Sequence, residues 1–325
     1  MARTRSRILT GDKMVASVRR RTTVPDDTSS FTDEDILATV DEELRVEVLP
    51  TLTEIHAEHL VLTVDVPRNE SGVYTIPHRA TGNTVRDISL ISGTNIYELA
   101  QISVGSLPDY SGHVSTLQEL DLFYIEGNKV KLVSPTRSYN SIRIRYHLSP
   151  NYLTKMEQAG IISSVVKDTV ADTLTITLSQ VGKNFVSNET YDIIGHKSPN
   201  VIKSYDLSPV TLTTGTTGTI VFTLSEVQNA DDIVEGDYVS LSEETPVPNI
   251  PTEMHSVLAQ AAAVQILESL GDFEAMVKAE ARLAKMSAAT QGLVDDRVEL
   301  APKKIKPRNG TLQTRRGRWG FGRNN

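Results

Sequence analysis

The residues closest to a metal-binding pattern are the two histidines of His-Ala-Glu-His at positions 56–59, with Glu58 between them. Zinc hydrolases of the His-Glu-x-x-His type carry their histidines four positions apart on one face of a helix. Here the spacing is three, and on a strand His56 and His59 would point to opposite faces. We therefore interpret both histidines as surface residues and predict no metal site.

A glycine-containing loop, Thr-Gly-Thr-Thr-Gly at positions 214–218, is superficially similar to a phosphate-binding loop. Such a loop needs a lysine and a serine or threonine after its last glycine, at a junction from strand to helix. Here Thr219 leads into another strand-like segment, and residues 195–198 (Gly-His-Lys-Ser) lack the upstream glycine. The sequence predicts a turn at this loop, and no cofactor.

Other residues of the kinds that catalyse reactions are scattered or absent. The acidic pairs at positions 231–232, 243–244 and 295–296 are typical of solvated surface charge, and the remaining histidines show no recognisable catalytic order. The chain has no cysteine, which excludes disulfides, thiolate zinc sites and cysteine nucleophiles together. We therefore expect a protein that is not an enzyme.

The C-terminal segment carries the most distinctive side chains, because residues 315–323 read Arg-Arg-Gly-Arg-Trp-Gly-Phe-Gly-Arg. Its guanidinium groups could bind phosphates while Trp319 and Phe321 stack on bases, or the two rings could fill a groove on a partner protein. A third interpretation is a solubilising tail. The protein groove is favoured, because only two rings could stack and because two upstream prolines favour an extended arm. The residues expected to bind the partner are Lys303, Lys304, Lys306, Arg308, Arg315, Arg316, Arg318, Trp319, Phe321 and Arg323.

Charge is unevenly distributed along this 325-residue chain, whose net charge is −8. Residues 1–21 carry a net charge of +6 and residues 303–325 carry +8, so the intervening body carries −22. A generic nucleic-acid binder would be basic over much of its surface, so we interpret the two ends as separate arms for a partner or for phosphate. No apolar run approaches membrane-spanning length, and no membrane partner is expected.

Residues 31–58 have the three- and four-residue apolar spacing of an amphipathic helix. Thr32 and Asp35 predict a capping box at its start, where acidic side chains also favour the helix dipole. Pro50 predicts that the helix is interrupted or ends there, because proline lacks the N–H of a helical hydrogen bond, although Leu52, Ile55 and Leu60 could continue a kinked helix. This segment is expected to be the first helix of a helical core.

Residues 250–298 predict two successive helices that form a hairpin. Gly271 suits the left-handed position at the end of the first helix, and Asp272 can cap the second. So short a joint implies an antiparallel pair. The residues predicted to build the helical core, and with it a ring, are Ile36, Val40, Leu44, Val257, Leu258, Val264, Leu267, Leu270, Met276 and Leu283.

Residues 59–150 and 151–249 show the two-residue alternation of β-strands and are predicted to be two β modules. In the first module, residues 122–133 have the pattern of a β-hairpin, with Gly127 and Asn128 at its turn. The second module alternates threonine with apolar residues in short strands, which is typical of a small sandwich or barrel.

The predicted fold class is therefore α+β. A helical core, formed by the N-terminal helix and the C-terminal helical hairpin, is interrupted by a large β-rich insertion of one or two small sandwich or barrel modules. Residues 1–30 are expected to be a basic, flexible N-terminal arm, and residues 299–325 an extended basic C-terminal arm.

Several short motifs occur in the helical segments and in the β insertion. They are Phe-Thr-Asp-Glu-Asp-Ile-Leu at 31–37, Tyr-Ile-Glu-Gly-Asn-Lys-Val at 124–130, Ile-Arg-Ile-Arg-Tyr at 142–146, Ile-Pro-Thr-Glu-Met-His-Ser-Val-Leu at 250–258, Leu-Glu-Ser-Leu-Gly-Asp at 267–272, and Arg-Val at 297–298 before the basic arm. In these motifs the chain resembles the head–tail adaptor (connector) proteins of tailed bacteriophages.

The resemblance implies a structural protein of the virion, assembled in the cytoplasm of a host bacterium. Adaptors of this kind form a ring, usually of twelve copies, beneath the portal protein at one capsid vertex. Their helices make the ring and face the portal, their C-terminal arm extends into portal clefts, and a downstream tail or neck protein binds below. Genomic DNA would pass through the channel without sequence-specific binding. The insertion of about 190 residues departs from the compact members of the family.

Two other functions remain open at the level of the sequence. The first is a nucleic-acid-binding protein that uses both basic arms, and salt-sensitive binding of DNA would distinguish it from an adaptor. The second is a carbohydrate-binding or hydrolytic role of the β insertion. No pair of acidic residues with glycosidase character supports that role.

Overall fold

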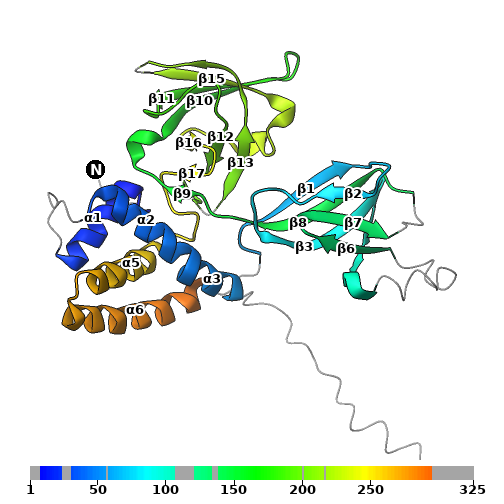
Figure 1. Ribbon diagram of the computed structural model, residues 1–325. Helices are drawn as coiled ribbons and strands as arrows, with labels where there is room; N and C mark the ends of the chain where they lie inside the picture. Colours follow the sequence, from blue (N-terminus) through cyan, green and yellow to red (C-terminus); the bar gives the residue numbers. More distant parts are fainter. Residues whose placement is uncertain are drawn as a thin grey trace, which may run out of the picture. The chain divides into compact units, whose positions relative to one another are not determined.

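A computed structural model describes residues 8–23, 31–55, 58–106, 121–133, 138–199, 201–215 and 217–294. These residues form a mixed α+β structure in which several β-sheets lie, in sequence order, between two groups of helices (Figure 1). Within these ranges no helix combines the length and the apolar character needed to cross a membrane. The predicted C-terminal arm lies outside the described residues.

The two groups of helices pack together in a helical module. Its elements are α1 (Gly11–Thr22), α2 (Asp33–Glu43), the π-helix η1 (Leu44–Val48), α3 (Leu49–Ile55), α5 (His255–Ser269) and α6 (Phe273–Val294). Helix α5 packs against α1, α2 and α6, and Figure 1 shows it between α2 and α6. Buried side chains of α1, α2, η1, α3 and α5 form one continuous apolar core.

Helix α1 corrects the expectation that residues 1–30 form a flexible arm. Met14, Val15 and Val18 are buried in the core of the helical module. Arg19 is also buried, and its Nη2 lies 2.8 Å from Oδ1 of Asp33 at the start of α2. This helix was not predicted from the sequence, because its apolar stripe is short and lies among charged residues.

The start of α1 fits closely against the chain that returns from the β modules. Gly11 N donates to the carbonyl oxygen of Pro246 over 2.9 Å. A Cβ atom at position 11 would lie only 2.1 Å from the carbonyl oxygen of Thr154. Glycine is therefore required at this contact by close approach of backbone.

Residues 32–55 form the expected helix, with a change of winding in the middle. The capping box is present, since Asp35 N donates to Thr32 Oγ1 over 3.2 Å and Thr32 N donates to Asp35 Oδ2 over 2.9 Å. In η1 the helix widens, and Leu49 N donates to the carbonyl oxygen of Leu44. The chain then continues as α3 through Pro50, so the proline does not end the helical segment.

The predicted helical hairpin is present as α5 and α6. Gly271 has a φ of +74° at the joint, a conformation that glycine adopts without strain. Ala275 N donates to Asp272 Oδ1 over 3.1 Å, which caps the start of α6 as expected. Local sequence therefore specified both ends of this joint.

The first β module consists of two four-stranded sheets around one apolar core. Its strands are β1 (Val61–Pro67), β2 (Val73–Thr75), β3 (Ala80–Ser92), β4 (Asn95–Glu98), β5 (Ala100–Gln101), β6 (Leu122–Glu126), β7 (Lys129–Val133) and β8 (Ser141–Leu148). The strand orders are β1-β8-β3-β4 and β2-β7-β6-β5. The predicted hairpin is confirmed, because β6 pairs with β7 around a turn in which Gly127 has a φ of +62°.

The second β module is a seven-stranded sheet in the order β13-β12-β16-β10-β11-β15-β14. Its strands are β10 (Gly160–Asp168), β11 (Thr173–Gln180), β12 (Tyr191–Ile194), β13 (Ile202–Leu207), β14 (Pro209–Thr213), β15 (Gly218–Thr223) and β16 (Tyr238–Leu241). Buried residues of β10 to β13, β15 and β16 share one core. The loop at 214–218 joins β14 to β15, with Thr213 opposite Thr219, so this loop is a turn between strands as expected.

Short elements complete the described chain. The 3₁₀ helices are η2 (Val104–Ser106), η3 (Met156–Gln158), η4 (Leu224–Glu226) and η5 (Ala230–Asp232). Strand β9 (Tyr152–Leu153), which precedes the second module, pairs in parallel with β17 (Glu244–Thr245), which follows it. The segments that lead into and out of this module therefore run side by side.

His59 corrects the expectation of a surface histidine. It is buried, and its Nε2 lies 3.1 Å from the carbonyl oxygen of Asn249. The chain thus enters the first β module and leaves the second at neighbouring points, an arrangement that keeps the entropic cost of closing a long insertion low. His56 lies outside the described residues.

Candidate functional site

The ten residues predicted to form the helical core differ in their burial. Six of them are buried, namely Ile36, Val40, Leu44, Val257, Leu258 and Leu267. Three are partly buried, namely Val264, Met276 and Leu283. Leu270 corrects the prediction, because its side chain is 47% exposed. Leu270 lies just after the end of α5. The apolar spacing of the sequence continues to this residue, but the helix has already ended, so the side chain is not turned into the core.

Helix α6 presents apolar side chains to solvent. Phe273 is 65% exposed and Val277 is 58% exposed, and residues four positions apart lie on the same face of a helix. Together with Leu270 they form what we call the α6 apolar surface. Exposed groups of large apolar side chains on a folded protein commonly mark binding surfaces. The hairpin thus has one face in the module and another that is free to contact a partner.

His255 connects the N-terminal segment to the start of α5. Its Nδ1 accepts from Leu9 N over 3.1 Å, so Nε2 carries the proton and donates to the carbonyl oxygen of Ile250 over 3.2 Å. Burial lowers the pKa of His255 to about 4. The imidazole ring is therefore neutral near pH 7. Because both of its nitrogens are hydrogen-bonded to backbone groups, its role is structural.

Asp41 of α2 holds the chain between the two β modules. Both of its carboxylate oxygens accept from Leu153 N, over 2.9 and 3.0 Å. Burial raises the pKa of Asp41 to about 7, against the opposing effects of that N–H and of Arg45. The Arg45 guanidinium in turn lies 3.7 Å from the ring centroid of Tyr152. Asp41 and Arg45 line a surface groove, but no nucleophile–base pair is present there among the described residues.

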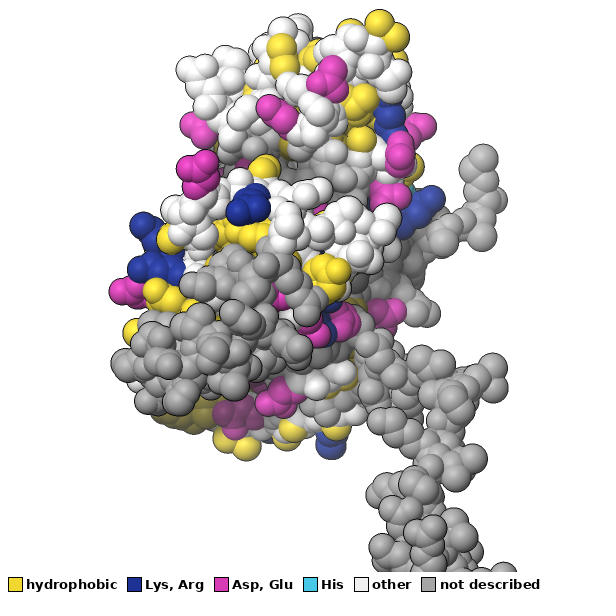
Figure 2. Space-filling view, turned by 90° about the vertical axis from the view of Figure 1, so that its right-hand side faces the viewer, with side chains coloured by type: hydrophobic (Ala, Val, Ile, Leu, Met, Phe, Trp, Pro, Cys, Tyr) yellow, Lys and Arg dark blue, Asp and Glu magenta, His cyan; other side chains and the backbone are white. Residues whose placement is uncertain are grey.

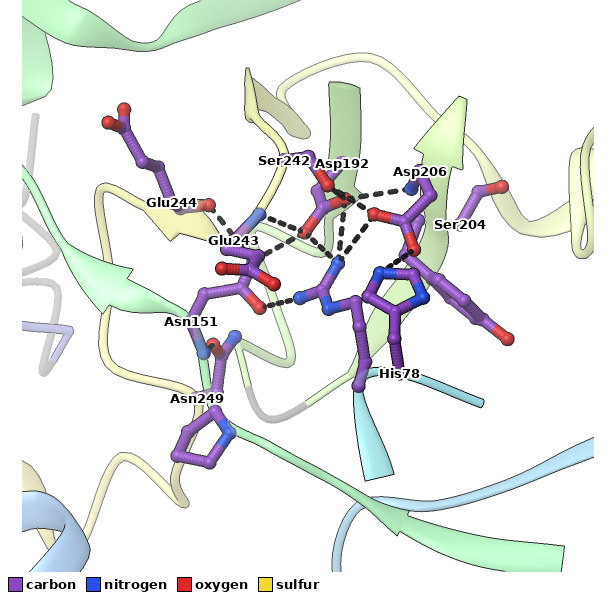
Figure 3. Close-up of polar contacts among 12 residues, drawn as sticks. His78, Asn151, Asp192, Ser204, Asp206, Ser242, Glu243, Glu244 and Asn249 are labelled. Atoms are coloured by element: carbon purple, nitrogen blue, oxygen red, sulfur yellow. Dashed lines mark hydrogen bonds and ion pairs between the residues drawn. The ribbon is translucent and has the colours of Figure 1, made fainter. Parts of the chain in front are cut away.

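A buried polar cluster lies where the two β modules meet, and Figure 3 shows Asn151, Asp192 and Asp206 in it. Arg79, just before β3, is 3% exposed, and Asp192 of β12 is fully buried. Arg79 Nη1 donates to both carboxylate oxygens of Asp192, over 3.1 and 2.8 Å. It also donates to Asp206 Oδ1 over 3.3 Å, and Nη2 donates to Asn151 Oδ1.

The remaining capacity of Asp192 is filled by other donors. Asn151 Nδ2 donates to it over 2.6 Å, Asp206 N over 3.0 Å and Glu243 N over 3.2 Å. Burial alone would lower the pKa of Arg79, but the carboxylates of Asp192 and Asp206 raise it above its ordinary value. Arg79 is therefore charged, and both of its Nη atoms donate to acceptors in the cluster. The cluster joins the two β modules, and at its edge Asp206 Oδ2 lies 3.4 Å from Nε2 of the exposed His78.

Charge on the visible surface is mixed. On the face in Figure 2, acidic and basic side chains of the described residues are interspersed, without a continuous basic stripe. Among all the described residues, no group of three His, Asp or Glu side chains is arranged as metal ligands would be. The predicted arm residues, from Lys303 to Arg323 and including Trp319 and Phe321, lie outside the described residues.

The comparisons with known proteins add no family. No family model matches the chain, and no curated protein has a significantly similar sequence.

Sequence reasoning missed the Arg79 cluster. One signal was present, because Asp192 is a single acid in the otherwise apolar strand Tyr-Asp-Ile-Ile. A buried carboxylate in such a strand needs a partner. Its partner Arg79 lies 113 positions away in the sequence, in a segment with no distinctive pattern. The carboxylate could thus have been suspected from sequence, but its partner could not.

Proposed function

We propose that this chain is a non-enzymatic head–tail adaptor of a tailed bacteriophage. In this proposal copies of the chain form a ring, of about twelve by analogy with the family, that joins the portal protein to a downstream tail or neck protein. The ring assembles in the bacterial cytoplasm and stays at the portal vertex of the virion. Genomic DNA passes through it without sequence-specific binding.

The observation that carries the proposal is the exposed apolar face of a helical hairpin at the end of the described chain. Leu270, Phe273 and Val277 are held at the surface by a well-packed α5, and the basic segment begins soon after α6 ends at Val294. Such a hairpin can pack on a partner while the following segment extends across it. An extended segment of about 25 residues spans about 80 Å, enough to cross a neighbouring subunit.

In this proposal the helical core, the β-rich insertion and the C-terminal arm have different roles. The helical core would form the ring and face the portal, with the β-rich insertion directed outward or towards the tail. The C-terminal arm would order only in a cleft of the portal, since ordering costs backbone entropy that a partner must offset. Repetition around a closed ring makes modest individual contacts collectively slow to release.

The test is a deletion of residues 303–325. We expect the truncated chain to keep the thermal unfolding of the full-length chain and to lose stable attachment to purified portal rings in co-sedimentation. Trp319→Ala combined with Phe321→Ala should weaken attachment less completely, because the basic residues remain. Unchanged attachment of the deletion variant would refute the role of the arm.

Nucleic-acid binding is a second candidate, favoured by a group of cations in the helical module. Arg20 and Arg21 of α1 and Arg282 of α6 line one surface pocket. Phosphate contacts would make binding of DNA by the full-length chain fall steeply between 50 and 200 mM salt. Weak binding that salt barely changes would leave the adaptor as the better proposal.

A further inference from the structure

The cationic pocket in the helical module is built from side chains with fixed positions. Arg21 Nη1 donates to the carbonyl oxygen of Ser256 over 2.9 Å and to Gln260 Oε1 over 2.8 Å. Gln260 is only 2% exposed, and its Nε2 donates to the carbonyl oxygen of Ala279 over 3.2 Å. The pocket, of about 430 Å³, thus has an ordered floor made by α1, α5 and α6.

The three arginines of this pocket have no acidic partner in the described part of the chain. No ion pair forms there to Arg20, Arg21 or Arg282, whereas Lys278 at the rim pairs with Glu274 one turn away. Burial lowers the pKa of Arg21, and the neighbouring charges of Arg282 and Arg20 lower it further. The fold therefore holds three like charges close together, an arrangement that an incoming anion would stabilise.

An opposite cluster lies on α2 and η1, and we call Glu42, Glu43 and Glu47 the acidic ridge. Glu43 is buried, and burial and then the hydrogen-bonded carboxyl of Glu47 raise its pKa. Gln265 of α5 also contacts Glu43 and opposes this shift. No described Lys or Arg forms an ion pair with any of the three acids. Val46, beside Glu47, is 70% exposed and adds an apolar contact to the ridge.

The two clusters lie on different sides of α5. Gln260 belongs to the cationic pocket and Gln265 contacts the acidic ridge. Five positions along an α-helix correspond to a rotation of about 500°, so the two side chains point about 140° apart around the helix axis. The pocket and the ridge therefore cannot meet within one chain, but two copies can bring them together.

We propose that the acidic ridge of one copy docks in the cationic pocket of the next, so that copies associate head to tail. This inference rests on the proposed function and names the contact that would join subunits of the ring. Arginine–carboxylate contacts are charge-assisted and geometrically specific. A heterologous contact of this kind generates a closed ring when its rotation permits closure.

A ridge of protein carboxylates fits the pocket better than a phosphate backbone does. The chain itself supplies two exposed acids, Glu42 and Glu47, beside the buried Glu43, and none of the three has a cationic partner among the described residues. Residues 22–302 carry a net charge of −22, which disfavours the approach of a long DNA backbone to the chain as a whole. Val46 at the ridge also supplies exposed apolar surface that a phosphate would leave uncovered.

The first test reverses charge on each side in the full-length chain. Arg282→Glu and Glu47→Arg each change an exposed side chain, and each should lower the self-association constant at least about tenfold in sedimentation. Combining one variant with the other in a mixture, or both in one chain, restores an attractive pair and should recover association. Lys197→Glu and Glu235→Arg are the matched controls, exposed and outside both clusters, and should associate as the unmodified chain does.

A second test uses the absence of cysteine from the chain. Arg282→Cys and Glu47→Cys copies, mixed under mild oxidation, should form a disulfide dimer at least tenfold faster than either variant alone. The pair Lys197→Cys with Glu47→Cys should show no such preference. Equal rates for all combinations would overturn the head-to-tail contact.

The outcomes separate this inference from the proposed function. If the chain forms rings on purified portal while the reversals leave assembly unchanged, the inference fails and the adaptor stands. If the chain neither self-associates nor binds portal, both fail. If the Arg282→Glu variant assembles normally but loses binding to duplex DNA, the pocket is a phosphate site and the inference is overturned.

Discussion

Charged side chains are arranged differently at the junction of the β modules and on the surface of the helical module. At the junction, Arg79 and Asp192 are both buried and paired with each other, and Asn151 and backbone N–H groups also donate to Asp192. On the helical module, Arg20, Arg21 and Arg282 gather without an acid in the described part of the chain.

This difference separates internal structure from a surface that needs a partner. Burying an ion costs several kcal/mol, so a buried charge persists only where its partners are complete. Like charges grouped near the solvent destabilise the fold less, so they can persist without an internal partner and remain accessible to a counter-charge on another molecule. The compensated cluster therefore holds the chain together, and the uncompensated ones are available for association. Four substitutions test that distinction.

Asp192→Ala should have the largest effect, because it leaves the Arg79 guanidinium buried without its main carboxylate. We expect a loss of about 3–5 kcal/mol in the free energy of unfolding, measured by urea denaturation. Glu157→Ala, which removes the exposed partner of Lys183, is the control and should change little. A loss below about 1 kcal/mol in Asp192→Ala would mean that the junction does not depend on this pair.

His255 should make the helical module sensitive to acid. Its pKa is lowered to about 4 by burial, whereas an unfolded histidine has a pKa of about 6.5. Between these values the unfolded state binds more protons, so stability falls as pH drops, by up to about 3 kcal/mol. Unfolding at pH 7 and pH 4.5 should show a smaller pH dependence in His255→Asn. His147→Asn, at a half-buried histidine on β8, should keep the full dependence.

Asp41 should act in the opposite sense over the same pH range. Burial raises its pKa to about 7, above the value of about 3.9 in an unfolded chain. Its stabilising contribution is therefore present at low pH and lost as pH rises through 7. Asp41→Asn still accepts from Leu153 N, so it should stabilise the chain at pH 8 by about 2 kcal/mol and give no gain at pH 4.5. Asp12→Asn, an exposed acceptor of Met156 N, should show no such crossover.

Arg282→Ala should have the smallest effect on stability, since it removes one of three cations that repel one another. We expect a change below about 0.5 kcal/mol in the free energy of unfolding, together with weaker self-association. A destabilisation comparable to that of Asp192→Ala would show that the pocket is a structural site, and would remove the contrast between the two regions.

Features that depend on neighbours in the sequence were predictable. The capping box of Thr32 and Asp35 and the joint at Gly271 and Asp272 follow from side chains that bond their own backbone. The β6–β7 hairpin follows from alternation on either side of Gly127. Each of these depends on a hydrogen bond or a φ angle within a few residues, which local residue types decide.

Other features depended on which distant segments meet. The short stripe of α1 gained its burial only from α5 and α2, and Leu270 lost its burial because α5 ends there. His59 is buried where its ring meets the carbonyl oxygen of Asn249, 190 positions later in the sequence.

By itself the sequence determined the α+β class, most of the described helices and the acidic body between basic ends. The tertiary structure alone decided that Arg79 meets Asp192, that Asp41 is buried beside Leu153, and that three arginines share a pocket away from three glutamates. The reason is that desolvation and charge pairing depend on separation in space. A hydrogen-bonded turn depends on separation along the chain, which is why the sequence reveals it.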